Sequence, residues 1–295
     1  MKSKLRYSRT LASWLCVVAA IAAFSPSSRA DDGAKRKNPT SKLYVADVEG
    51  DSFINTGDKI ADLTKKSVYS AEGTIIETKP DSSNALVLSN GTGISFDPDT
   101  KLEMKRFLQE PFSPNRNDVD VEPSVSQTAA FLPRGTVGLC TSKMVAGSTM
   151  TYSTPQATVA IHGRKVVIES NGNTTTVSML EGDATIGGGG AGGDSLHVGQ
   201  QAIITRNSPS APPTIKIQPI PADQQDALSD KVATACMARK TVYFSVAERN
   251  ANDTYSSVFS ETTDAGEVIV PVEVLPGTID PGVTVSPSAI TRNNP

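Results

Sequence analysis

Apolar and polar residues alternate in short runs along most of this chain, and Gly, Asn and Pro separate the runs. Residues 100–107 alternate with a period of two, as expected of a half-buried strand. Segments 85–88 and 94–96 flank Asn90-Gly91, a pair typical of a tight hairpin turn. Similar runs recur between residues 43 and 207. The pattern predicts a mainly β fold of short stacked strands, arranged as two packed sheets or as a β-helix-like coil.

A helical pattern occurs once, at residues 223–239, where Leu228, Val232 and the pair Ala235/Cys236 recur every three to four residues. Acidic residues come early in this segment and basic residues come last, which suits the helix dipole. Strands are expected after it at 242–246 and 267–274. The predicted organisation begins with a leader at residues 1–30, a disordered mature N-terminus at 31–42 and a β domain at 43–207. A Pro-rich linker at 208–221, a small α/β appendage at 222–275 and a disordered tail at 276–295 follow.

The first thirty residues have the pattern of a secretory leader. Four basic residues within Met1–Arg9 precede an apolar stretch of 14 residues that ends at Phe24, and small residues stand at Ser28 and Ala30. The apolar stretch is shorter than the ~20 residues of a spanning helix. We expect cleavage after Ala30 and a periplasmic or cell-envelope location, with membrane contact only through the leader before cleavage. An uncleaved anchor is the alternative.

Charge argues against one class of partner. Five of the 28 Lys and Arg residues, and none of the 31 acids, lie in residues 1–30, so residues 31–295 carry a net charge of −8. An acidic surface repels phosphate backbones, so no nucleic-acid partner is expected.

Two cysteines, Cys140 and Cys236, follow the leader. In an oxidising compartment an even pair favours a disulfide, and a loop near 100 residues would stabilise the fold by up to about 4.7 kcal/mol. Two buried free thiols are the alternative, because the sequence does not give the distance between them.

Catalytic residue types are scarce. The chain has two histidines, His162 and His197, and neither has a partner at metal-ligand spacing. No motif for an activated serine or cysteine is found. Carboxylates at every second residue (Asp47, Glu49, Asp51, and Asp118, Asp120, Glu122) suggest either a calcium site or a solvated edge, and we favour the edge because loop-type ligand spacing is lacking. We expect no enzyme, no metal and no cofactor.

Four segments, taken in order, resemble the FecR-type periplasmic domain, named for the iron-dicitrate transport regulator. They are residues 73–78, residues 85–100, residues 153–163, and residues 180–184 with 198–202. Their shared order and spacing carry the resemblance, which covers roughly Val68 to Thr205. The motif positions are Gly73, Thr78, Gly91, Thr100, Thr154, Pro155, His162, Gly163, Gly182 and Gly199.

The chain departs from the family pattern in two ways. His162 stands where the family has Arg, and Arg164 stands where it has Thr, so a buried guanidinium is either missing or supplied by Arg164. Only Met1–Arg9 precedes the apolar stretch, too little to hold a sigma factor, so direct anti-sigma action is not expected. The resemblance implies an exported, non-enzymatic signalling, sensing or interaction module that engages another envelope protein. A structural or glycan-binding envelope protein is the alternative.

Overall fold

The computed structural model describes residues 41–110, 112, 120–187, 193–206, 208, 211–246, 261–262 and 268–272. These residues belong to one compact unit. The predicted leader, most of the predicted mature N-terminus and the predicted tail lie outside the described residues.

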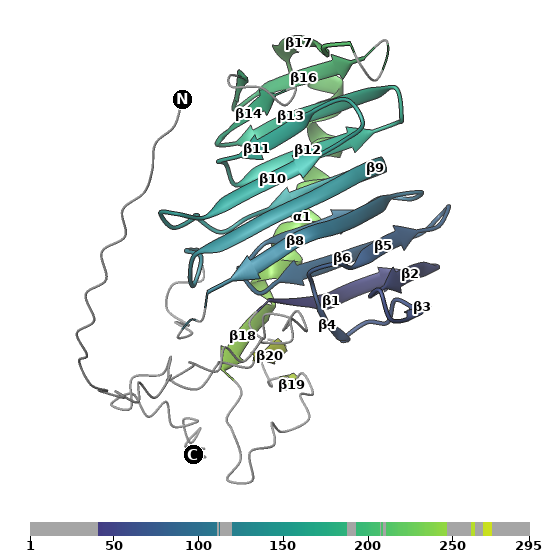
Figure 1. Ribbon diagram of the computed structural model, residues 1–295, viewed down its shortest axis with the longest axis vertical. Coiled ribbons are helices and arrows are strands. Elements are labelled where there is room, and N and C mark those ends of the chain that lie inside the picture. Colours follow the sequence, from purple (N-terminus) through teal and green to yellow (C-terminus); the bar gives the residue numbers. More distant parts are fainter. Residues whose placement is uncertain are drawn as a thin grey trace, which may run out of the picture. The chain divides into compact units, whose positions relative to one another are not determined.

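Strands dominate, as predicted, and those before the helix form two sheets, A and B (Figure 1). Along sheet A the strand order is β4 (Val68–Ser70), β1 (Lys42–Glu49), β6 (Ser83–Leu88), β7 (Gly93–Phe96), β9 (Ser126–Cys140), β12 (Lys165–Ser170), β13 (Thr174–Glu181), β16 (Gln200–Thr205) and β17 (Thr214–Pro219). Along sheet B it is β3 (Ile60–Asp62), β2 (Ser52–Asn55), β5 (Ile75–Thr78), β8 (Lys101–Gln109), β9, β10 (Thr149–Ser153), β11 (Thr158–Ile161), β14 (Asp183–Gly187) and β15 (Asp194–His197).

Strand β9 belongs to both sheets. Its first half pairs with β8 and β10 in sheet B, and its second half pairs with β7 and β12 in sheet A. The change of sheet falls near Pro133, which has no N–H to donate, and Gly135, whose φ is +94°. The apolar runs at 129–132 and 136–140, separate in the sequence pattern, are joined in the structure into one bent strand.

The core lies between the two sheets. Alternate residues of the strands face inward and are buried in one cluster, for example Leu86 and Val166 from sheet A and Ile76 and Val159 from sheet B. Strand pairing within both sheets is antiparallel except for β9 with β10. Of the two predicted arrangements, the structure therefore has the packed sheets and not the coil.

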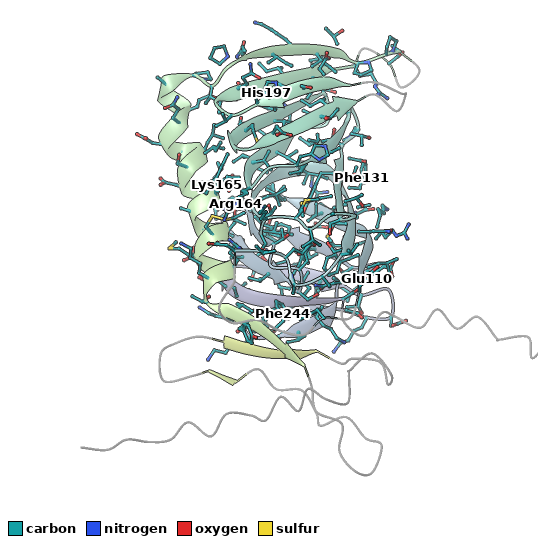
Figure 2. All side chains as sticks on the ribbon, turned by 90° about the vertical axis from the view of Figure 1, so that its left-hand side faces the viewer. Glu110, Phe131, Arg164, Lys165, His197 and Phe244 are labelled. Atoms are coloured by element: carbon teal, nitrogen blue, oxygen red, sulfur yellow. A yellow bond between two sulfur atoms is a disulfide. The ribbon has the colours of Figure 1, made fainter. Side chains whose placement is uncertain are left out.

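The helix is α1 (Gln225–Lys240), preceded by the 3₁₀ turn η1 (Ala222–Gln224), close to the predicted range. Val232 and Ala235 are buried against the outer face of sheet A, as their spacing predicted. Figure 2 shows α1 running along one side of the two sheets. No helix among the described residues is long and apolar enough to span a membrane.

The predicted linker at residues 208–221 is partly wrong. Residues 214–219 form strand β17, which pairs with β16 along its whole length. Its Ile215 and Ile217 pack against the core, and Pro219 is tolerated because β17 is the last strand of sheet A. The predicted appendage at residues 222–275 is also partly wrong, because its helix α1 packs on sheet A and belongs to the β domain. After α1, strands β18 (Val242–Val246), β19 (Glu261–Thr262) and β20 (Val268–Val272) form a small separate sheet.

Candidate functional site

Two glycines of sheet A, Gly93 and Gly138, lie under α1, and we call this pair the glycine floor. A Cβ on Gly93 would lie 2.9 Å from the carbonyl carbon of Ala235, and a Cβ on Gly138 would lie 2.9 Å from the carbonyl oxygen of Lys231. The helix backbone therefore rests directly on strands β7 and β9. Sequence reasoning missed this site, although a glycine inside a strand pattern is the known signal of close backbone approach.

Polar contacts fix the helix on this floor. Ser95 donates its hydroxyl to the carbonyl oxygen of Lys231 at 2.7 Å, which joins β7 to the middle of α1. The ammonium of Lys231 pairs with Asp97 just beyond the end of β7. These contacts hold the register of the helix along the sheet.

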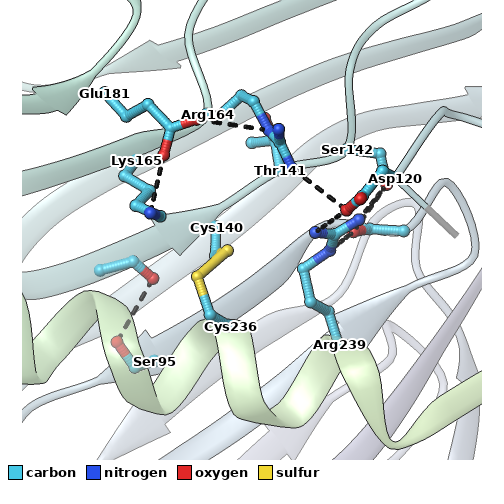
Figure 3. Close-up of a disulfide and its surroundings, with 12 residues drawn as sticks. Ser95, Asp120, Cys140, Thr141, Ser142, Arg164, Lys165, Glu181, Cys236 and Arg239 are labelled. Atoms are coloured by element: carbon cyan, nitrogen blue, oxygen red, sulfur yellow. Dashed lines mark hydrogen bonds and ion pairs between the residues drawn. A yellow bond between two sulfur atoms is a disulfide. The ribbon is translucent and has the colours of Figure 1, made fainter.

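The structure joins Cys140 and Cys236 in a disulfide, with 5.1 Å between their Cα atoms (Figure 3). Cys140 ends β9 and is buried, and Cys236 lies in α1, so the bond ties the helix to the sheet. The alternative of two free thiols, left open by the sequence, is not the arrangement found.

A buried guanidinium is present, but it comes from Arg239 at the end of α1. Its Nε donates to the carbonyl oxygen of Gly91 at 2.9 Å, and its Nη2 donates to the hydroxyl of Ser142 at 2.6 Å. Only 5% of this side chain is exposed, and burial lowers the pKa of the guanidinium. Arg164 was one of two predicted possibilities for this role, but its guanidinium is partly exposed and pairs with Asp120 at 3.2 Å.

A groove of about 700 Å³ runs beside the disulfide between α1, β12 and β13. Its rim carries Arg164, Lys165 and Glu181, and the Lys165 ammonium lies 2.7 Å from the Glu181 carboxylate. The hydrogen bond from Lys165 lowers the pKa of Glu181. Each of these charges pairs with another of the three or with Asp120, so the groove holds a network of ion pairs between loops and strands of sheet A.

The motif glycines occupy turns. Gly73, Gly91, Gly182 and Gly199 all have φ between +78° and +96°, a conformation that favours glycine. Gly163 and Gly182 also face each other so closely that neither has room for a Cβ. The hairpin tip at Asn90-Gly91 is confirmed, with the N–H of Gly91 donating to the carbonyl of Leu88 at 2.9 Å.

The motif threonines bind backbone. The hydroxyl of Thr78 donates to the carbonyl of Asp97 at 2.7 Å and accepts from the N–H of Thr100 at 2.9 Å. The hydroxyl of Thr154 accepts from the N–H of Ala157 at 3.1 Å, while Pro155 beside it is exposed. These positions shape turns, and they do not converge on a common site.

The two histidines are brought to the same part of sheet B. His162 donates its backbone N–H to the carbonyl of Asp183 at 3.0 Å, and His197 is the register partner of Asp183 on the other side. The side chains of His162 and His197 are exposed. Within the described residues, no three metal-ligating side chains gather to hold an ion.

The two carboxylate runs differ in the structure. Asp47 pairs with Lys65 at 2.7 Å, and the hydrogen bond from that ammonium lowers the pKa of the carboxyl. In the second run, Asp120 is exposed, whereas Glu122 is buried and bonded to the hydroxyl of Ser126 and the N–H of Val145. Asp118 lies outside the described residues.

Residues 74–185 match the family model described as FecR protein. No curated protein matches the chain. Two crystal structures of a "putative anti-sigma factor" from Parabacteroides distasonis ATCC 8503 are 12% identical to it with a TM-score of 0.39, and the matches cover 67% and 66% of this chain and 97% of each of those chains. FecR domains are in general regulatory, non-catalytic and periplasmic. Residues 74–185, which supply the centre of both sheets, therefore form a FecR domain.

Proposed function

We propose that this chain is an exported, non-enzymatic receiver module that acts by binding another protein of the cell envelope. The observation that carries the proposal is the FecR domain at residues 74–185, since domains of this family are regulatory. The disulfide between Cys140 and Cys236 supports export, because such bonds persist in oxidising compartments.

The chemistry of the motif positions supports a role in binding. The motif threonines bind backbone groups, as Thr78 does with Thr100. The motif glycines form turns or allow close backbone contact, as Gly163 and Gly182 do. Side chains used in this way are not available to activate a nucleophile or hold a substrate. Since α1 packs on the outer face of sheet A, what the domain offers is the outer face of sheet B and the edges of both sheets. Sheets can recognise proteins through such surfaces.

The test is capture of a partner by the full-length, tagged chain in its native envelope. We expect one defined protein to co-purify with the oxidised form, and mass spectrometry to find a mature N-terminus at Asp31. Retention on purified cell-wall or polysaccharide material, with no protein partner, would favour the structural or glycan-binding role. A hydrolytic turnover that disappears in His162→Ala would overturn the non-enzymatic assignment.

A further inference from the structure

The outer face of sheet B, opposite the helix-covered side, concentrates positive charge. Strand register places Phe53, Glu77, Lys101 and Arg134 side by side on β2, β5, β8 and β9, and the next row holds Ile75, Glu103 and Phe131. Directly paired residues share one face of a sheet. In Figure 2, Phe131 lies on the side of the sandwich away from α1.

We name this surface the cationic face and define it by Lys79, Lys101, Lys105, Arg106 and Arg134, which surround Glu77 and Glu103. Asp62, the register partner of Phe53 on β3, extends the row, so five cations against three carboxylates give the face a charge of +2. The whole chain carries −3. The sign of the face is therefore opposite to that of the molecule.

The cations of this face remain available to a partner. Arg134 and Lys79 share Glu77 at 3.0 and 3.3 Å, while Lys101 and Lys105 share Glu103. Two carboxylates thus serve four of the five cations, which keep between 28% and 59% of their side chains exposed. Exposed ion pairs of this kind contribute little to folding, so the clustering of charge needs another reason.

Aromatic rings lie among these cations. The Lys79 ammonium is 5.2 Å from the centre of the Phe53 ring, and the Lys105 ammonium is 5.8 Å from that of Phe131. Both rings are only half-buried on the open face. Arginine and aromatic side chains are enriched at protein interfaces, where an aromatic ring can serve as the buried anchor.

We propose that the cationic face docks an acidic segment of a partner protein, an inference that rests on the proposed function and names the surface that performs it. Charge complementarity requires a negative partner. Glu77 and Glu103 indicate that this partner is a protein, because these carboxylates would repel a polymer or lipid surface of uniform negative charge in every orientation. A protein can place its acidic residues on Lys101 and Arg134 and a neutral or basic residue opposite Glu77.

The experiment compares full-length wild-type chain with Lys101→Glu/Arg134→Glu, and with Lys216→Glu/Lys240→Glu as a control of equal charge change on β17 and α1. Lys105→Glu/Arg106→Glu serves as a second face variant. Each variant is first checked for folding by circular dichroism. A carbodiimide cross-linker, which leaves no spacer, then joins lysine amines to carboxylates that lie in contact in the native envelope. Mass spectrometry identifies the linked peptides.

We expect wild-type lysines of the cationic face to link to aspartates or glutamates of one partner segment. Both face variants should bind that partner about tenfold more weakly, the control should bind it as wild type does, and added salt should weaken binding. A partner retained equally by the face variants would overturn this inference and leave the proposed function standing. No partner at all would overturn both, and binding of wild type to phosphatidylglycerol vesicles in place of a protein would overturn the docking of a protein segment.

Discussion

The glycine floor under α1 predicts that a single added carbon will dislodge the helix. In Gly93→Ala the new Cβ would lie 2.0 Å from the carbonyl oxygen of Ala235 and 3.3 Å from the Cβ of Arg239. The φ of Gly93 is outside the left-handed region, so alanine adds no backbone strain. Because the oxygen belongs to the helix backbone, rotation of a side chain cannot relieve the clash, and α1 must move.

The size of the effect follows from the distances. Real Cβ atoms essentially never approach another atom closer than 3.0 Å, so α1 must shift outward by about 1 Å. Such a shift breaks the 2.7 Å bond from Ser95 and the 2.9 Å bond from Arg239, each contributing about 1 kcal/mol. Loosened packing costs about 1–3 kcal/mol more, and the loss of glycine freedom in the unfolded chain returns up to about 1 kcal/mol. We expect a net destabilisation of about 3 kcal/mol.

Urea denaturation of the oxidised protein measures the loss, and hydrogen exchange of the α1 amides reports whether the helix has moved. A double-mutant cycle with Cys140→Ser/Cys236→Ser supplies the control, because a helix released from the disulfide can yield and the penalty of Gly93→Ala should shrink. If Gly93→Ala unfolds within about 0.5 kcal/mol of wild type with unchanged exchange, α1 does not rest on β7 as described.

Three further predictions concern other parts of the fold. Cys140→Ser/Cys236→Ser should lower the free energy of unfolding by up to about 4.7 kcal/mol, because the disulfide joins residues 96 apart in sequence and so closes a long loop. An unchanged urea midpoint would contradict this. Gly182→Ala should be far more destabilising than Gly73→Ala by thermal denaturation, because both have positive φ but only Gly182 has backbone packed against it; equal losses would refute the packing argument. The hydrogen bond from Lys105 lowers the pKa of Glu103, so its contribution is present above the unfolded pKa of about 4.3 and is lost as pH falls through the folded pKa. Urea titrations between pH 6 and pH 3 should show a shallower decline in Glu103→Gln, by at most about 1 kcal/mol at pH 6, and parallel curves would contradict this.

The local pattern of the sequence determined the class of fold. Alternation at residues 100–107, the Asn90-Gly91 turn and the helical spacing of Val232 and Ala235 each depend on neighbours in the chain, and each corresponds to an element of the structure. The resemblance to the FecR domain likewise rested on short motifs along the chain, whose turn glycines have positive φ.

Only the tertiary structure decided which surfaces meet. The pairing of Cys140 with Cys236, the seat of α1 on Gly93 and the alignment of Lys101 with Arg134 all join segments distant in sequence. Such contacts depend on strand register and on how one element packs on another, and register is set by the whole buried face of a sheet. The composition of the chain showed that the protein is acidic, but only the fold showed where its basic residues gather into the cationic face.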